Sequence, residues 1–139
     1  MSAQANITLA DGQVSPANVV FYANGVHSTK DGSAVATYKS REASGIGIAA
    51  KTLTLVVRET PTKIDVDRRI TTPVLEVISG SDGGYTPKPK VAYNLFSREQ
   101  FALPARSSLA ERKDLLAFCK NLNADAVMQS AVWNFEPVW

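Results

Sequence analysis

The chain has 139 residues, of which 45% are hydrophobic and 20% are charged, and its formal net charge is +2 at pH 7. This size and composition are typical of one globular domain that can bury a core. The small positive charge permits nucleic-acid binding but does not by itself indicate it. The sequence contains no apolar run near the roughly 18 residues of a membrane span. The first residues lack the regions of a signal peptide, and the single cysteine excludes an internal disulfide, so we expect synthesis in the cytoplasm.

The first part of the chain predicts an N-terminal β-hairpin within residues 1–25. Short apolar runs at residues 6–9 and 18–23 lie on either side of an Asp-Gly pair, which favours a tight turn. A further turn is expected at the Asn-Gly pair of residues 24–25. Residues 33–40 then alternate between apolar and polar side chains, which predicts the next strand.

Residues 51–59, KTLTLVVRE, are predicted to form the central strand of a sheet. Leucine and valine side chains alternate there with threonines and an arginine, which indicates a strand with two unlike faces. Residues 63–72 and 90–103 repeat this alternation. Pro73 is expected to end the first of these strands or to lie at a sheet edge, because proline cannot donate to a strand ladder. Residues 74–89 are predicted to form a long loop rich in glycine and proline.

The hydrophobic period then changes, and two helices are predicted within residues 107–135. Ser108 and Glu111 have the spacing of a capping box, in which a hydroxyl and a carboxylate satisfy free amides at a helix start. An apolar stripe at helical spacing follows. It consists of Leu109, Leu115, Leu116, Phe118, Cys119 and Leu122. Residues 121–123 are expected to interrupt the first helix, and Pro137 is expected to end the second.

Strands followed by segregated helices predict an α+β fold. Residues 1–139 form one predicted domain, with the N-terminal hairpin, about five antiparallel strands over residues 33–103, and two C-terminal helices. Two helices are a modest cover for such a sheet. We therefore expect a symmetric dimer, in which helices of both subunits cover one continuous sheet.

The sequence contains no convincing catalytic, metal or cofactor site. His27 lies in a turn-rich segment and Cys119 on the apolar stripe, so they do not indicate a nucleophile and its base. We expect a solvated or capping histidine and a buried, inert cysteine. Asp65 and Asp67 share a strand face and could hold a hard cation, but a solvated acidic patch is the favoured interpretation. We therefore predict no enzymatic activity and no cofactor.

The polar side of the predicted sheet is the remaining candidate for a binding surface. Hydroxyls, guanidinium groups and one aromatic ring are predicted to share it. These residues are Thr52, Thr54, Arg58, Arg69, Thr71, Asn94, Phe96 and Arg98. Guanidinium groups can pair with phosphates and a base can stack on the ring, which suits single-stranded or looped RNA. An ordinary solvated sheet with one aromatic packed at its edge explains the composition equally well.

The order of these motifs resembles the coat proteins of single-stranded RNA bacteriophages of the levivirus type. The similarity covers nearly the whole chain. It is most telling in residues 22–26, in residues 51–59, and in residues 93–103, which lead through Pro104 into the first helix. The glycine- and proline-rich loop resembles the loop that meets its copies at the symmetry axes of the shell, and its lack of cysteine excludes disulfides between capsomers.

The resemblance implies an interlocked dimer, with the helices of each subunit crossing the sheet of the other. It also implies that dimers assemble into an icosahedral, T=3 shell around the single-stranded genomic RNA. The inner sheet face of the family binds RNA, including a hairpin at the replicase start, so the coat protein also represses replicase translation. We expect the protein in the virion, made in the bacterial host cytoplasm, with no membrane partner.

The resemblance also assigns roles to single residues. Thr52 and Thr54 fall where the family contacts RNA on its central strand, and Arg69 falls at a basic contact. Phe96 falls at an aromatic that stacks on a base, and Arg98 at a neighbouring polar contact. Phe96 lacks a phenolic hydroxyl and Thr52 stands where a lysine is common, so the chain departs from the family's pattern at two contacts. The alternative to a coat protein is a dimeric cellular α+β module that binds RNA and forms no shell.

Overall fold

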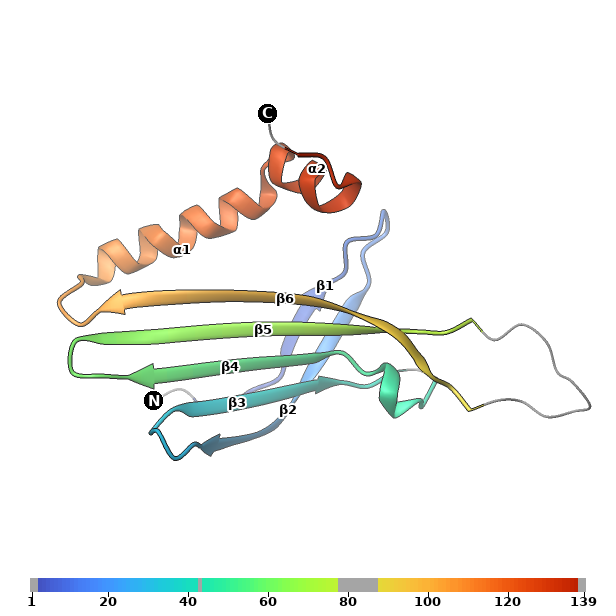
Figure 1. Ribbon diagram of the computed structural model, residues 1–139, viewed down its shortest axis with the longest axis horizontal. Coiled ribbons are helices and arrows are strands. Elements are labelled where there is room, and N and C mark those ends of the chain that lie inside the picture. Colours follow the sequence, from blue (N-terminus) through green and yellow to red (C-terminus); the bar gives the residue numbers. More distant parts are fainter. Residues whose placement is uncertain (1–2, 43, 78–87, 138–139) are drawn as a thin grey trace, which may run out of the picture. The chain divides into compact units, whose positions relative to one another are not determined.

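The computed structural model describes residues 3–42, 44–77 and 88–137. Within these residues, six strands form one sheet and two α-helices follow it, which confirms the α+β prediction (Figure 1). The strands are β1 (Ile7–Ala10), β2 (Asn18–Ser28), β3 (Ala34–Ser40), β4 (Thr52–Glu59), β5 (Lys63–Leu75) and β6 (Val91–Pro104). A 3-10 helix, η1 (Gly47–Ala49), precedes β4, and the α-helices are α1 (Leu109–Ala124) and α2 (Ala126–Asn134). The chain divides into two compact units, Met1–Ala102 and Leu103–Trp139, and each is described by itself.

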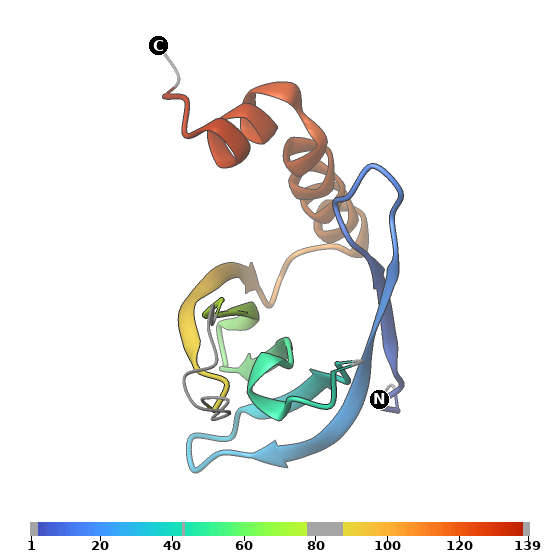
Figure 2. The same ribbon diagram turned by 90° about the vertical axis from the view of Figure 1, so that its right-hand side faces the viewer.

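The strands lie in the sheet in the order in which they occur in the sequence. Each pair from β1 to β5 is antiparallel, and the sheet is curved rather than flat (Figure 2). The predicted N-terminal hairpin is β1 and β2, and it belongs to the same sheet as the other strands. The turn predicted at residues 24–25 is wrong, because β2 continues to Ser28 through a bulge between Ala23 and Val26. Gly25 has a φ of 104° there, a conformation that glycine adopts without steric cost.

Pro73 lies inside β5, so the prediction that this strand ends there is wrong. The pairing of β5 with β4 reaches only as far as Thr71, which lies opposite Thr52. Proline therefore removes no hydrogen bond from that ladder. The predicted loop of residues 74–89 begins later, after Leu75, and most of it (residues 78–87) lies outside the described residues.

One face of the sheet, which we call the core face, carries the buried apolar side chains. Phe21, Tyr38 and Leu53 are buried together on β2, β3 and β4. The register places Tyr38 opposite Leu53 and Leu53 opposite Ile70, so these side chains share a face. Partly buried side chains complete the cluster: Ile7, Val19, Ala36 and Ile70. The side chains further along β4 on this face are less buried: Leu55 is half-buried and Val57 is exposed.

The helical unit begins with the predicted capping box. The Ser108 hydroxyl accepts a hydrogen bond from the Glu111 backbone N–H, and the Glu111 carboxylate accepts one from the Ser108 N–H at 2.7 Å. The interruption predicted at residues 121–123 comes later, at Asp125, whose carboxylate accepts from the Val127 N–H at 2.9 Å and so caps α2. Phe135, with a φ of 57°, ends α2 before Pro137.

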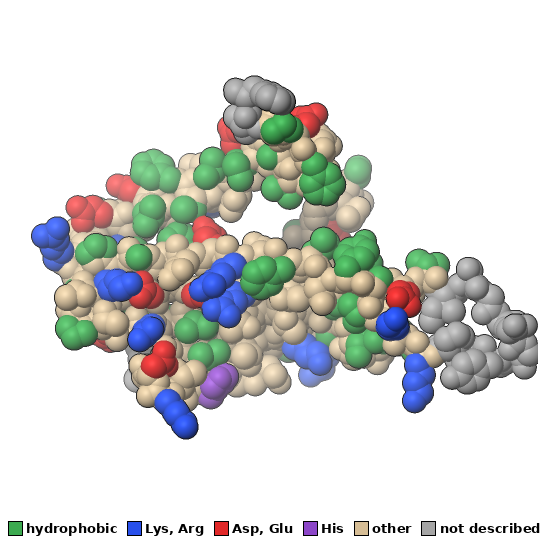
Figure 3. Space-filling model, viewed as in Figure 1, with side chains coloured by type: hydrophobic (Ala, Val, Ile, Leu, Met, Phe, Trp, Pro, Cys, Tyr) green, Lys and Arg blue, Asp and Glu red, His purple; other side chains and the backbone are tan. Residues whose placement is uncertain are grey.

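The apolar stripe of the helices is exposed in the single chain. Both helices are fully described, and neither contains a buried residue. Phe118 is 69% exposed, and Cys119 is half-buried rather than buried as predicted. Figure 3 shows hydrophobic side chains spread over both helices. In the described part of the chain, neither helix combines the length and the apolar character that crossing a membrane requires.

Candidate functional site

The sheet face opposite the core face is lined mainly by polar side chains, and we call it the polar face. Rows of residues opposite one another define it across the strands. One row runs from Tyr22 through Lys39 and Thr52 to Thr71. The next rows contain Thr37, Thr54 and Arg69, then Val35, Val56 and Asp67, then Arg58 and Asp65. Side chains that alternate with Leu53 and Tyr38 therefore all emerge on one side.

The structure brings the eight sequence-predicted residues to this polar face. Thr52, Thr54 and Arg58 come from β4, and Arg69 and Thr71 come from β5. Arg98 of β6 bonds to Asp67, which places its side chain on the same face. Asn94 and Phe96 precede Arg98 at intervals of two residues along β6, so they share that face. Phe96 is 62% exposed, so its ring is accessible for stacking in the single chain.

Asp67 joins two arginines into a charged cluster on the polar face. Its carboxylate is bound by two guanidinium groups in the same forked geometry. The Nη2 atoms of Arg69 and Arg98 each donate to Oδ2 at 2.7 Å, and their Nε atoms each donate to Oδ1 at 3.3 Å. Each fork uses two of the five N–H donors of an arginine, so three donors on each side chain remain. Two positive charges and one negative charge leave this group with a net charge of +1.

The two arginines change the titration of the carboxyl. The pKa of Asp67 is lowered, chiefly by the hydrogen bonds from Arg69, while burial opposes this shift and Arg98 adds to it. The same contact raises the pKa of Arg69. Asp67 is only 8% exposed, so it is not the solvated acidic group that the sequence suggested. Its negative charge is satisfied by protein groups and needs no bound cation.

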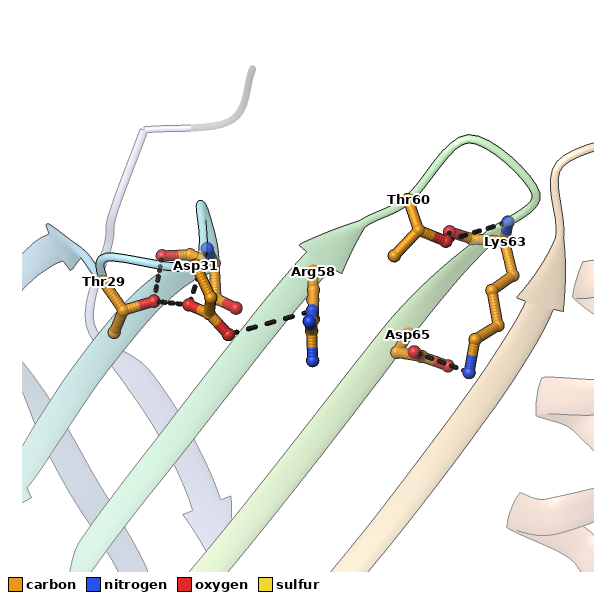
Figure 4. A network of polar contacts seen from close by, with 7 residues as sticks. Thr29, Asp31, Arg58, Thr60, Lys63 and Asp65 are labelled. Carbon is orange, nitrogen blue, oxygen red and sulfur yellow. Dashed lines mark hydrogen bonds and ion pairs between the residues drawn. The ribbon is translucent and has the colours of Figure 1, made fainter.

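A second polar network closes the end of the sheet where β2 turns into β3 and β4 turns into β5 (Figure 4). Arg58 lies 3.8 Å from Asp31, measured between Nε and Oδ2, and Lys63 lies 2.9 Å from Asp65. Asp31 also accepts a hydrogen bond from the Thr29 hydroxyl, which is the first cause of its lowered pKa. Arg58 of the predicted site therefore already has a carboxylate partner. Within the described residues, no group of three His, Cys, Asp or Glu side chains could hold a metal ion.

Sequence reasoning missed the part of the polar face that β2 and β3 supply. Tyr22 and Lys39 lie in the same row as Thr52, and the Thr37 side chain lies beside Thr54. The alternation of residues 33–40 was sufficient to predict a strand, but the face on which Lys39 lies depends on its register with β4. His27 of β2 lies opposite Val35 and is exposed, as expected for a solvated histidine.

The comparison of the chain with protein families gives a match to the levivirus coat protein family over residues 2–139. No match is found among curated proteins. Among solved structures, the chain is similar to the virus-like particle of bacteriophage NT-214, with 29% identity and a TM-score of 0.87 over 99% of this chain and 100% of that chain.

Two further solved structures support the fold. The virus-like particle of bacteriophage ESE058 has 24% identity and a TM-score of 0.85, over 99% of this chain and 100% of that chain. The protein capsid of bacteriophage GA has 15% identity and a TM-score of 0.69, over 96% of this chain and 95% of that chain. The family match over nearly all residues favours the coat-protein interpretation over the cellular RNA-binding module.

These findings agree with the architecture described above, in which a curved antiparallel sheet precedes two helices. The protein is a structural, non-enzymatic component of a phage capsid and assembles with its own copies into a shell. The chain belongs to the levivirus coat protein family.

Proposed function

We propose that the polar face of the sheet binds the single-stranded genomic RNA inside the shell. The observation that carries this proposal is the convergence of the Arg69 and Arg98 guanidinium groups, the exposed Phe96 ring and the β4 threonines on one face. Unused guanidinium donors can bond phosphates, and the ring offers a surface for a base. A net charge of +2 per chain is small, so many copies acting together would retain the genome.

The subunit in the shell is, on this proposal, an interlocked homodimer. The helices bury none of their residues in the single chain. Large apolar side chains are exposed on both: Leu116 and Phe118 on α1, and Val132 and Trp133 on α2. Leu95, on the core-face side of β6, is also 58% exposed. Exposed apolar surface of this extent is typical of an interaction surface. A second copy of the chain is the partner that the capsid role supplies, and its helices and sheet would cover these side chains.

We extend the proposal to the finer features of the family. The dimers form an icosahedral, T=3 shell, and the protein is made in the bacterial host cytoplasm before assembly. A hairpin at the replicase start would bind to the same polar face and so repress translation. Phe96 and Thr52 offer fewer polar contacts than a tyrosine and a lysine would, so we expect weaker discrimination between hairpins than the family's pattern suggests.

Expression of the chain alone tests the shell and its RNA together. We expect spherical particles in electron micrographs, with nuclease-protected RNA inside and an image reconstruction of T=3 symmetry. Particles without RNA would contradict RNA binding but not assembly, and small species alone would contradict both.

Two substitutions test the face directly. Arg69→Ala and Phe96→Ala should each weaken binding of single-stranded RNA by about tenfold while the dimer stays intact, as stacking and charge-assisted contacts predict. Lys113→Ala, on an exposed position of α1, removes the same charge as Arg69→Ala and is the matched control. Unchanged RNA affinity in both face variants would refute the assignment of RNA to this face.

A further inference from the structure

A cavity of about 390 Å³ opens at the end of the polar face away from Arg98, and we call it the Tyr22 pocket. Side chains of β2 and β3 and the segment before β4 line it. They include Tyr22, Asn24, Lys39, Arg41, Gly45 and Gly47. Its volume falls in the range of about 300–1,000 Å³ that is usual for ligand pockets. None of the eight residues predicted from the sequence lines this pocket.

The Tyr22 pocket is continuous with the polar face. Tyr22 lies opposite Lys39, Lys39 lies opposite Thr52, and Thr52 lies opposite Thr71. Paired positions on neighbouring strands are close enough for their side chains to touch. An RNA strand that lies along this row would therefore pass from the predicted contacts on β4 and β5 into the pocket.

The pocket contains cations that the protein does not neutralise. The Arg41 guanidinium lies over the Tyr22 ring, 4.2 Å from its centroid. Among the described residues, no carboxylate forms an ion pair with Arg41 or with Lys39. One carboxylate, that of Glu42, also lines the pocket, and it is already occupied by the Lys51 ammonium group at 3.2 Å and by the Ser40 hydroxyl at 2.8 Å.

This arrangement differs from the other end of the polar face, where every arginine has a partner. Arg69 and Arg98 share Asp67, and Arg58 lies near Asp31. A guanidinium on an aromatic ring keeps its N–H donors at its edge available to an anion while its flat side stacks. The pocket thus offers positive charge for a phosphate and a planar surface for a base.

We infer that the Tyr22 pocket binds one nucleotide of single-stranded RNA, with the phosphate against Lys39 and Arg41 and the base against the stacked Arg41 and Tyr22. This inference rests on the proposed RNA-binding function and adds a second subsite to it. Proteins recognise unstacked RNA bases by stacking on aromatic rings and guanidinium planes, which is the surface present here.

Gly47 allows the pocket to be blocked without a change of charge. A Cβ atom added at Gly47 would meet no other atom within 4 Å, and Gly47 does not have a positive φ. The Cβ atom of a leucine at this position therefore meets no clash, and Gly47 lines the pocket, so a larger side chain here would narrow it. Gly45 is unsuitable for the same purpose, because its φ of 70° lies in the left-handed region, which residues other than glycine rarely adopt.

The experiment uses the purified full chain at concentrations below shell assembly and a labelled single-stranded RNA of about 12 nucleotides, a length suited to a few subsites. Fluorescence anisotropy over a range of salt concentrations gives the affinity and its salt dependence. The variants are Lys39→Ala with Arg41→Ala, Gly47→Leu, and Lys113→Ala with Lys120→Ala as a control that removes two charges from α1. Circular dichroism verifies that each variant is folded.

We expect the Lys39→Ala, Arg41→Ala variant to bind at least tenfold more weakly and to lower the slope of log K against log salt by about 0.7 for each lost phosphate contact. Gly47→Leu should weaken binding severalfold with all charges kept, and the α1 control should bind like the wild type. Wild-type affinity in both pocket variants, with Arg69→Ala still weakened, would overturn the pocket and leave the proposed function intact. A wild-type chain that does not bind RNA would overturn both.

Discussion

The sheet and the helices of this chain differ in where their apolar side chains lie. The sheet buries Phe21, Tyr38 and Leu53 in a cluster of its own, whereas α1 and α2 bury no residue in the single chain. The cluster stabilises β2 to β4 by contacts within one chain. The helices expose their apolar stripe, and in the proposed dimer a second copy would cover it. On that proposal, the stability of the helices would rise with protein concentration, because dimer formation and folding would be coupled.

The largest effect is expected from a charge placed in the exposed stripe. Phe118→Asp should abolish the dimer, because a carboxylate without a partner in an apolar interface costs about 3 kcal/mol or more. Asn121→Asp adds the same charge to a polar position of α1 and should leave the dimer intact. Analytical ultracentrifugation measures both. A Phe118→Asp dimer of wild-type affinity would show that this stripe is not the interface.

A cavity in the core face should have a smaller but still large effect. Leu53 is 8% exposed and lies in the centre of the buried cluster. Leu53→Ala should lower the free energy of unfolding by about 2–5 kcal/mol, as truncation of buried leucines does. Leu109→Ala, at a position 59% exposed in the single chain, is the comparison for the helical unit. Urea unfolding at one fixed protein concentration distinguishes them, and equal losses would mean that both leucines are equally buried in the assembled protein.

Replacement of Asp67 should separate stability from RNA affinity. Asp67→Asn removes the carboxylate that Arg69 and Arg98 share, and we expect a loss of about 1 kcal/mol in unfolding free energy, because both guanidinium groups are partly exposed. The net charge of the group rises from +1 to +2, so affinity for single-stranded RNA at low salt should increase severalfold. Glu76→Gln changes the charge equally near Lys90 and is the control. Weaker RNA binding by Asp67→Asn would mean that the arginines need the carboxylate to hold their positions.

The same variant tests a pH dependence. The pKa of Asp67 is lowered in the folded chain, so its ion pairs contribute stability that is fully present above the unfolded-state pKa of about 4. This contribution is lost as the pH falls through the folded-state pKa. The stability difference between wild type and Asp67→Asn should therefore shrink as the pH is lowered from 7 to 3. A difference that stays constant over this range would contradict the assigned shift.

The smallest effect is expected at the helix start. Ser108→Ala removes the hydroxyl of the capping box and should cost about 1 kcal/mol, whereas Ser108→Gly should cost only a few tenths. The pKa of Glu111 is lowered by its hydrogen bonds from the Ser108 backbone and side chain, so part of this stability is lost in acid. Thermal unfolding of the three proteins at neutral pH measures the difference. Identical melting curves would show that α1 does not need this cap.

Local patterns in the sequence were sufficient for most of the elements. The alternation around Leu53 predicted β4, and the spacing of Ser108 and Glu111 predicted the start of α1. The wrong predictions concern features whose conformation depends on the neighbouring strands of the sheet. The Asn24–Gly25 pair forms a bulge instead of a turn because β3 continues alongside β2, and Pro73 stays in β5 because β4 no longer pairs there.

The sequence by itself determined which side chains of each strand share a face, because a strand alternates its side chains with a period of two. It therefore predicted eight residues that lie on the polar face, including Thr54 and Phe96, but not the residues that β2 and β3 add to it. Only the tertiary structure decided how the strands align, since register depends on contacts between distant segments. That register brought Lys39 and Tyr22 into the row of Thr52, and it joined Asp67 to two arginines from different strands.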